Sequence, residues 1–125
     1  MHQPIHSDSA PKAIGPYSQA IRAGTTVYLS GQIPLIAATG QLIEGDVAAQ
    51  TRQVMDNLAA VLFASGLTFH HVVKATLYVI DLADFATINT VYGERFSGHP
   101  PARSTVQVAA LPRGARIEID LIAVG

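Results

Sequence analysis

Residues 116–124 alternate between polar and apolar side chains near the end of the chain. Because successive side chains of a β-strand point to opposite faces, this pattern predicts a strand with Glu118 and Asp120 on one face. A carboxyl group in a pocket can take a proton from water and later return it to a leaving group, which is general acid–base catalysis. The alternative is a solvated strand face, on which Glu118 only pairs with Arg116 or Lys74.

A second strand-like run, residues 103–109, begins with an arginine shortly after two prolines. The planar guanidinium of Arg103 can bind a carboxylate through two parallel hydrogen bonds, each worth about 1.5–3 kcal/mol. The alternative is a surface arginine without a ligand. A plain hairpin about Arg113 and Gly114 would leave Arg103 about 20 Å from the residue opposite Glu118, at 3.3 Å per residue. We therefore expect the two charged groups to meet across a subunit boundary rather than within one chain.

Two segments show the three- and four-residue spacing of apolar side chains that predicts a helix. The first follows the candidate N-cap Asp46 and stops at Gly66. The second follows an acidic capping pattern at Asp81 and Asp84 and stops at the prolines of residues 99–101. Its buried stripe is expected to consist of Phe85, Ile88, Tyr92 and Phe96.

The remaining strands are predicted at residues 18–22 and 26–30, joined by a turn, and at residues 72–80. The order β-β-α-β-α-β-β predicts an α+β domain with both helices packed on one face of a single sheet. The other face would be bare in a monomer, which predicts an oligomer. The low share of charged residues, 14%, also favours an oligomer.

Composition narrows the possible functions. The 125 residues form a single domain, residues 1–125, of which residues 1–9 are expected to be a mobile tail. A net charge of −1 without a basic stripe argues against a nucleic-acid partner, and the absence of cysteine excludes a thiolate nucleophile. No apolar run could span a membrane and no secretory signal is readable, so we expect a cytoplasmic protein. The scattered histidines predict no metal site.

Five short motifs, in order along the chain, resemble the Rid family, the reactive intermediate deaminases of YjgF type. They are residues 10–20 (APKAIGPYSQA), 30–34 (SGQIP), 101–104 (PARS), 111–112 (LP) and 117–119 (IEI). Each motif is weak by itself, but all five in register cover the chain from about residue 10 to its end. The resemblance implies a chorismate-mutase-like fold, a homotrimer, and sites in the clefts between subunits. It also implies that a further strand lies between the last two strands in the sheet, so that they would not pair as a plain hairpin.

Carried over by position, Arg103 resembles the arginine that binds the substrate carboxylate, and Glu118 the residue that activates the attacking water. Tyr17 resembles a residue that covers the substrate and donates its hydroxyl, although a tyrosine after Gly-Pro is often a packing anchor. The remaining pocket positions of the family correspond to Ser30, Gly31, Asn89 and Thr105.

Each of these pocket positions has a competing interpretation. Ser30 and Gly31 could form an ordinary turn, and Asn89 could be a buried polar tether. Thr105 stands where many members of the family have cysteine, which puts any cysteine-dependent chemistry in doubt. Asp120 stands where glutamate is common and is expected to be a surface residue.

The resemblance implies an enzyme without a cofactor that hydrolyses reactive 2-imino or enamine acids, such as 2-aminoacrylate and 2-aminocrotonate. The products would be a 2-oxo acid and ammonia. An alternative is a regulatory module that binds small carboxylates through Arg103 without turnover. A third interpretation, endoribonuclease activity, fits poorly with the near-neutral charge and the lack of an aromatic, basic surface.

Overall fold

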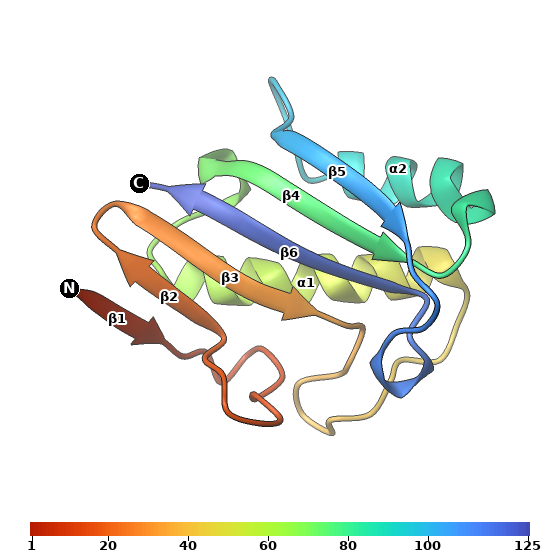
Figure 1. Ribbon diagram of the computed structural model, residues 1–125, viewed down its shortest axis with the longest axis horizontal. Helices are drawn as coiled ribbons and strands as arrows, with labels where there is room; N and C mark the ends of the chain where they lie inside the picture. Colours follow the sequence, from red (N-terminus) through yellow and green to blue (C-terminus); the bar gives the residue numbers. More distant parts are fainter.

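The computed structural model describes all 125 residues and contains one sheet of six strands with two α-helices on one of its faces (Figure 1). The order of the strands in the sheet is β1-β2-β3-β6-β4-β5. All neighbouring strands are antiparallel except β4 and β5. The strands are β1 (His2–Ile5), β2 (Ala20–Ala23), β3 (Thr26–Gln32), β4 (Val72–Val79), β5 (Ala102–Gln107) and β6 (Ile117–Val124). The predicted α+β architecture is confirmed.

The long helix α1 (Val47–Ala64) forms as the sequence predicts. The Asp46 side chain accepts a hydrogen bond from the Ala49 amide at 2.9 Å, and this cap satisfies one of the free amides of the first turn. The helix ends at Ala64 with Ser65 as its C-cap, and the following Gly66 adopts a left-handed conformation (φ 77°). The predicted start and end of this helix are therefore confirmed.

The hydrophobic core lies between α1 and the sheet face that the helices cover. Each fully buried aliphatic side chain in such a layer contributes about 1.5–3 kcal/mol relative to an exposed one. The apolar side of β6 is completely buried, as its alternation predicts. The core includes Val54, Leu58, Val61 and Leu62 of α1 with Leu77, Ile117, Ile119 and Leu121 of the sheet.

The second helix, α2 (Phe85–Gly93), is shorter than predicted and is capped differently. Asp84 forms no cap hydrogen bond, because both of its carboxylate oxygens accept from Arg116, at 3.0 Å each. Asp81 instead caps the preceding 3-10 turn η2 (Leu82–Asp84) by accepting from the Ala83 amide. Neither helix is long and apolar enough to cross a membrane.

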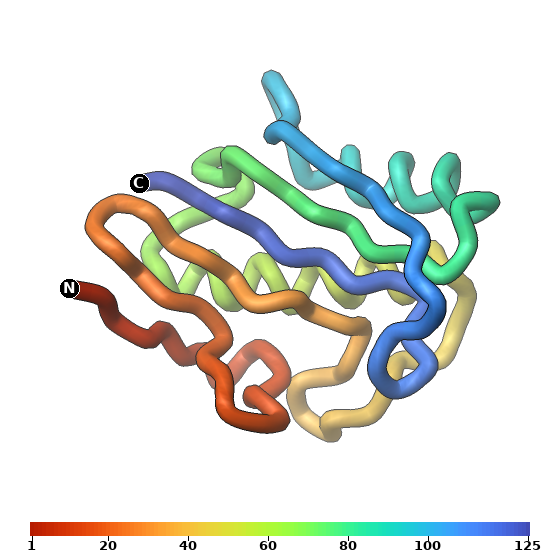
Figure 2. Tube along the Cα trace, viewed as in Figure 1, coloured from red at the N-terminus to blue at the C-terminus, as the bar shows by residue number.

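Strand β4 lies between β5 and β6, so the simple hairpin pairing of the last two strands is wrong. Parallel strands need a crossover connection, and α2 provides it between β4 and β5. The chain then returns through the 3-10 turn η3 (Pro112–Gly114) to the centre of the sheet (Figure 2). The separation that the family resemblance implies is confirmed.

The first residues differ from the expected mobile tail, because β1 pairs with β2 along the edge of the sheet. Pro4 lacks an amide hydrogen, and the edge of a sheet is where such a residue is tolerated. The Gln19 side chain ties the following segment to the domain. It accepts from the Ser7 amide at 2.6 Å and donates to the carbonyls of Ser7 and Pro11 at 3.1 and 2.8 Å.

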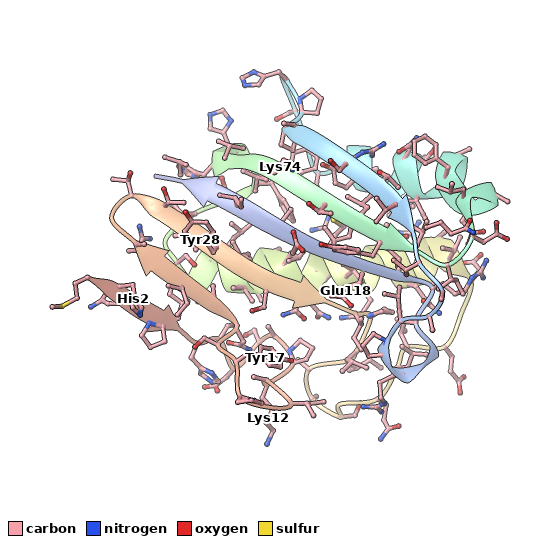
Figure 3. The ribbon with its side chains drawn as sticks, in the orientation of Figure 1. His2, Lys12, Tyr17, Tyr28, Lys74 and Glu118 are labelled. Carbon is pink, nitrogen blue, oxygen red and sulfur yellow. The ribbon has the colours of Figure 1, made fainter.

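The second face of the sheet carries no helix. Tyr28, Lys74 and Glu118 are labelled on this open face in Figure 3, where the helices lie behind the sheet. Several apolar side chains of this face are solvent exposed, among them Tyr28 with 51%, Val106 with 42% and Val124 with 42% of their surface accessible. Exposed apolar side chains on a bare sheet face are typical of a surface that another chain covers.

Candidate active site

Glu118 lines a cavity of about 510 Å³ at the end of β3. The N-terminal segment, the bend after β3 and the turn η3 form its other walls. Tyr17 lies beside Glu118 at this end of the sheet (Figure 3). The sequence-predicted residues in this cavity are Tyr17, Ser30, Gly31 and Glu118, and the charged residues that the sequence analysis did not place there are Lys12 and Arg113.

Gly31 allows the Glu118 carboxyl group to lie directly against the backbone of β3. A Cβ atom at Gly31 would lie 2.9 Å from the carboxyl carbon of Glu118, closer than real Cβ atoms approach such an atom. The register between β3 and β6 shifts between Leu29 and Gln32, which indicates a bulge at this point of the ladder. Such irregularities are frequent next to active sites, where they redirect side chains. The ordinary-turn interpretation of Gly31 is wrong, because residue 31 lies within β3.

The Glu118 carboxyl group has no cationic partner. Arg116 pairs with Asp84 instead, and none of the three ion pairs of the structure includes Glu118 or Lys74. Burial raises the pKa of Glu118 above its ordinary value, and the nearby charge of Asp120 raises it further. A carboxyl group whose pKa is raised in this way is suited to exchanging protons with a ligand in the cavity.

Two hydroxyl groups of the cavity are fixed by backbone contacts. The Tyr17 hydroxyl accepts from the Ile14 amide at 3.2 Å, which leaves its own proton free for a ligand. The Ser30 hydroxyl donates to the Ser18 carbonyl at 2.6 Å, so its oxygen remains available as an acceptor.

Arg103 belongs to a different part of the chain's surface. In the strand register, Arg103 of β5 lies opposite Ala75 of β4, whose side chain is buried under the helices. Glu118 of β6 lies opposite Tyr78 of β4, whose side chain is on the open face. Side chains on opposite faces of a sheet cannot converge on one small ligand. Within one chain, therefore, the structure does not bring Arg103 and Glu118 together.

The Arg103 guanidinium is held in place from the α2 side. Its Nη1 donates to the Asn89 side-chain oxygen at 2.8 Å. It also lies over the rings of Phe85 and Tyr92, at 5.3 and 5.1 Å from their centroids. Asn89, Tyr92 and Arg103 line a second cavity, of about 380 Å³. An oriented guanidinium at a cavity can bind a carboxylate without first losing side-chain entropy.

Two buried hydroxyl groups beside Arg103 have no hydrogen-bond partner, those of Tyr92 and Thr105. Thr105 follows Arg103 on the same face of β5. Burial raises the pKa of Tyr92, and the charge of Arg103 opposes this shift in part. The Tyr92 hydroxyl can bond a ligand or water that enters the cavity, whereas Thr105, predicted as a pocket residue, does not line it.

Several residues that position the walls and side chains of these two cavities were not predicted from the sequence. Asn57 of α1 donates to the carbonyls of Ile33 and Leu35, at 3.3 and 2.9 Å, and so fixes a wall of the Glu118 cavity. A polar residue beside the apolar stripe of α1 was the sequence feature that could have indicated this role. Phe85 and Tyr92 were predicted only as core residues of α2, because cation–π contacts leave no sequence signature. No three side chains suited to metal binding lie together.

The chain is thus a small α+β protein with one sheet and two helices. It has two half-sites, one cavity beside Glu118 and a separate cavity beside Arg103. The family model described as Endoribonuclease L-PSP matches residues 7–125. The crystal structure of the Rid family protein YyfA from Yersinia pestis matches with a TM-score of 0.97 at 45% identity, and covers 100% of both chains. The chain belongs to this family, the YjgF/Rid family.

Two relatives of known name match nearly all of the chain. Protein DfrA from Myxococcus xanthus is 63% identical over 122 residues, which are 96% of this chain and 93% of that protein. The 2-iminobutanoate/2-iminopropanoate deaminase from Mus musculus is 48% identical over 120 residues, which are 96% of this chain and 89% of that protein. The family's imine deaminases are therefore similar to this chain over its whole fold.

Proposed function

We propose that this chain is a hydrolytic deaminase that converts small 2-imino or enamine acids into 2-oxo acids and ammonia. The observation that carries this proposal is the Glu118 carboxyl group, half-buried in its cavity against Gly31 without a cationic partner. The name of the mouse relative supports the substrate class, 2-iminobutanoate and 2-iminopropanoate.

The chemistry requires two functions that the two half-sites supply. Arg103 binds the substrate carboxylate through two parallel hydrogen bonds and so fixes the position of the adjacent C=N carbon. Glu118 accepts a proton from water as the water oxygen bonds to that carbon, and passes it to the imine nitrogen, which becomes an amine. Glu118 then takes the proton of the new hydroxyl group and gives it to that amine as the C–N bond breaks, so that ammonia leaves and a 2-oxo acid remains.

The assembly that would unite the half-sites is a homotrimer, in which Arg103 of one protomer faces Glu118 of its neighbour. Two features support it: the two groups lie on opposite faces of one sheet, and the open face exposes apolar side chains. In a closed ring of identical chains, each contact joins two different surfaces, so every cleft can combine an arginine cavity with a glutamate cavity. Tyr17, Ser30 and Gly31 belong to the glutamate side, and Asn89 and Thr105 to the arginine side.

A coupled assay tests the activity. Threonine dehydratase supplies 2-aminocrotonate, and the formation of 2-oxobutanoate is followed with and without the protein. We expect faster formation with the wild-type chain and loss of that acceleration in Arg103→Ala. Arg52→Ala, which removes an exposed arginine of α1, is the matched control and should retain full activity. No acceleration by the wild-type chain, or full activity in Arg103→Ala, would contradict the proposal.

The family description favours one other activity, cleavage of RNA. The net charge of −1 gives little electrostatic attraction to a phosphate backbone. Incubation with single-stranded RNA across a salt titration separates the two activities. Binding at physiological salt, with cleavage lost in Glu118→Gln, would favour the nuclease.

A further inference from the structure

A cluster of three ionisable side chains lies on the open face beside the Glu118 cavity. Glu118 and Asp120 occupy successive positions of this face on β6, roughly 7 Å apart along the strand. Tyr78 lies directly opposite Glu118 on β4. Its hydroxyl group reaches diagonally across and donates to Oδ2 of Asp120 at 3.0 Å.

Charge neutralisation does not explain this cluster. Asp56 and Asp84 each form an ion pair with an arginine, whereas neither Glu118 nor Asp120 has a cationic partner. Two neighbouring carboxylates without a cation repel each other and so lower the stability of the fold. The Tyr78 hydroxyl is the only side-chain partner of Asp120. An arrangement that costs stability and lies next to a cavity is typical of a functional site.

We propose that Asp120, anchored by the Tyr78 hydroxyl, is a positioning residue that keeps Glu118 against Gly31 as a proton-exchanging group. This inference rests on the proposed deaminase function and adds to it two residues outside the cavity. Neither residue lines the cavity, so both act through Glu118. Asp120 lies on the open face, as expected of a surface residue, but it is half-buried and its carboxylate accepts a hydrogen bond from the Tyr78 hydroxyl.

The electrostatics of the cluster agree with this geometry. The charge of Asp120 raises the pKa of Glu118 in addition to burial, and the hydrogen bond to Asp120 raises the pKa of Tyr78, so Tyr78 remains a protonated donor. Glu118 can therefore take up the proton of the attacking water more readily than an isolated glutamate. The other ionisable groups that face Glu118 from the walls of the cavity are Tyr17, Lys12 and Arg113.

Two readouts on the full-length protein test the role of Asp120. The first is the titration of the Glu118 side-chain carboxyl carbon by NMR, which requires no activity. The second is the pH profile of kcat and kcat/KM for 2-aminocrotonate hydrolysis. In Asp120→Asn we expect the Glu118 titration and the acidic limb of the profile to move to lower pH. We expect kcat to fall severalfold with KM unchanged, because Arg103 still binds the substrate carboxylate.

Further variants separate this role from a merely structural one. Asp120→Glu keeps the charge and should restore the wild-type titration, and Tyr78→Phe should shift it in the same direction as Asp120→Asn but less. The double variant should match Asp120→Asn, because Tyr78 acts through Asp120. Glu94→Gln, a charge removal at the end of α2 on the other side of the sheet, is the matched control and should change neither readout.

The outcomes are distinguishable from failure of the deaminase proposal. A Glu118 titration in Asp120→Asn that coincides with wild type overturns the role of Asp120, as does a double variant that shifts further than Asp120→Asn. A wild-type chain that hydrolyses no 2-imino acid overturns the deaminase proposal. In that case the titration alone decides whether Asp120 controls Glu118.

Discussion

The Arg103 and Glu118 half-sites are built in opposite ways. The guanidinium of Arg103 is held by an amide oxygen of Asn89 and by two aromatic rings on the helix-covered face. The carboxyl group of Glu118 forms no side-chain hydrogen bond or ion pair and faces a cavity of about 510 Å³. A group that recognises a substrate gains from being fixed in advance, whereas a group that exchanges protons must be free of competing partners.

The two cavities lie on opposite faces of the sheet within one chain. Each half-site opens from its own face of the sheet, and the layer between them is the packed strands themselves. In the proposed assembly, recognition by Arg103 and acid–base chemistry by Glu118 act on one substrate where two chains meet. The exposed side chains of the open face, such as Tyr28 and Val106, offer the apolar surface for that contact.

The largest effect on activity is expected from a substitution of Glu118, which leaves the Arg103 cavity unchanged. Glu118→Gln keeps the size of the side chain but cannot exchange a proton, so kcat for 2-aminocrotonate should fall by about 10²- to 10⁴-fold. Binding of 2-oxobutanoate, measured by calorimetry, should remain within a fewfold of wild type, because Arg103 supplies it. A variant that loses binding and turnover together would show that the two halves do not have separate roles.

A pair of glycine substitutions gives a smaller effect and contrasts the two halves directly. A Cβ at Gly31 meets the Glu118 carboxyl group, so Gly31→Ala should lower kcat by about 10- to 100-fold through displacement of that group. A Cβ at Gly93, in α2 on the arginine side, meets nothing within 4 Å. Gly93→Ala should instead raise the free energy of unfolding by about 0.5–1 kcal/mol, measured by urea denaturation. Equal activity of the two variants would contradict the close contact at Gly31.

The smallest expected effect is on the pH dependence of stability. Burial raises the pKa of Glu118 in the folded chain, so between its ordinary and its raised value the folded chain holds more protons than the unfolded one. The free energy of unfolding should therefore fall as the pH rises through this window. Glu118→Gln removes this contribution, so urea denaturation should show it gaining stability over wild type from acidic to neutral pH. A constant difference across that range would mean that the carboxyl group is not perturbed.

Much of the fold was predictable from local patterns, and the pairing of strands was not. The alternation of β6 and the cap at Asp46 are local signals, and both are confirmed. The position of β4 between β5 and β6 depends on the crossover through α2, which no local pattern encodes. Strand β1 was missed because four residues with a proline at the third position carry too little pattern.

The candidate site residues could be predicted from the sequence, but most of the side chains that contact them could not. The alternation placed Glu118 on the polar face of β6, and the strand run after residue 101 made Arg103 a candidate. The stacking of Arg103 on Phe85 and Tyr92, and the bond from Tyr78 to Asp120, depend on side chains that meet only after folding. The sequence therefore indicates the candidate reacting groups, and the structure adds the residues that contact them.

The central claim is that Arg103 and Glu118 act from neighbouring chains, and complementation between two inactive variants tests it most directly. Arg103→Ala and Glu118→Gln chains are co-expressed in equal amounts with different tags, and mixed assemblies are assayed for 2-aminocrotonate hydrolysis. In a randomly mixed trimer population, shared sites would restore about a quarter of the wild-type activity, because each mixed trimer regains one intact cleft of three. Activity no higher than that of the two parent variants would contradict the claim.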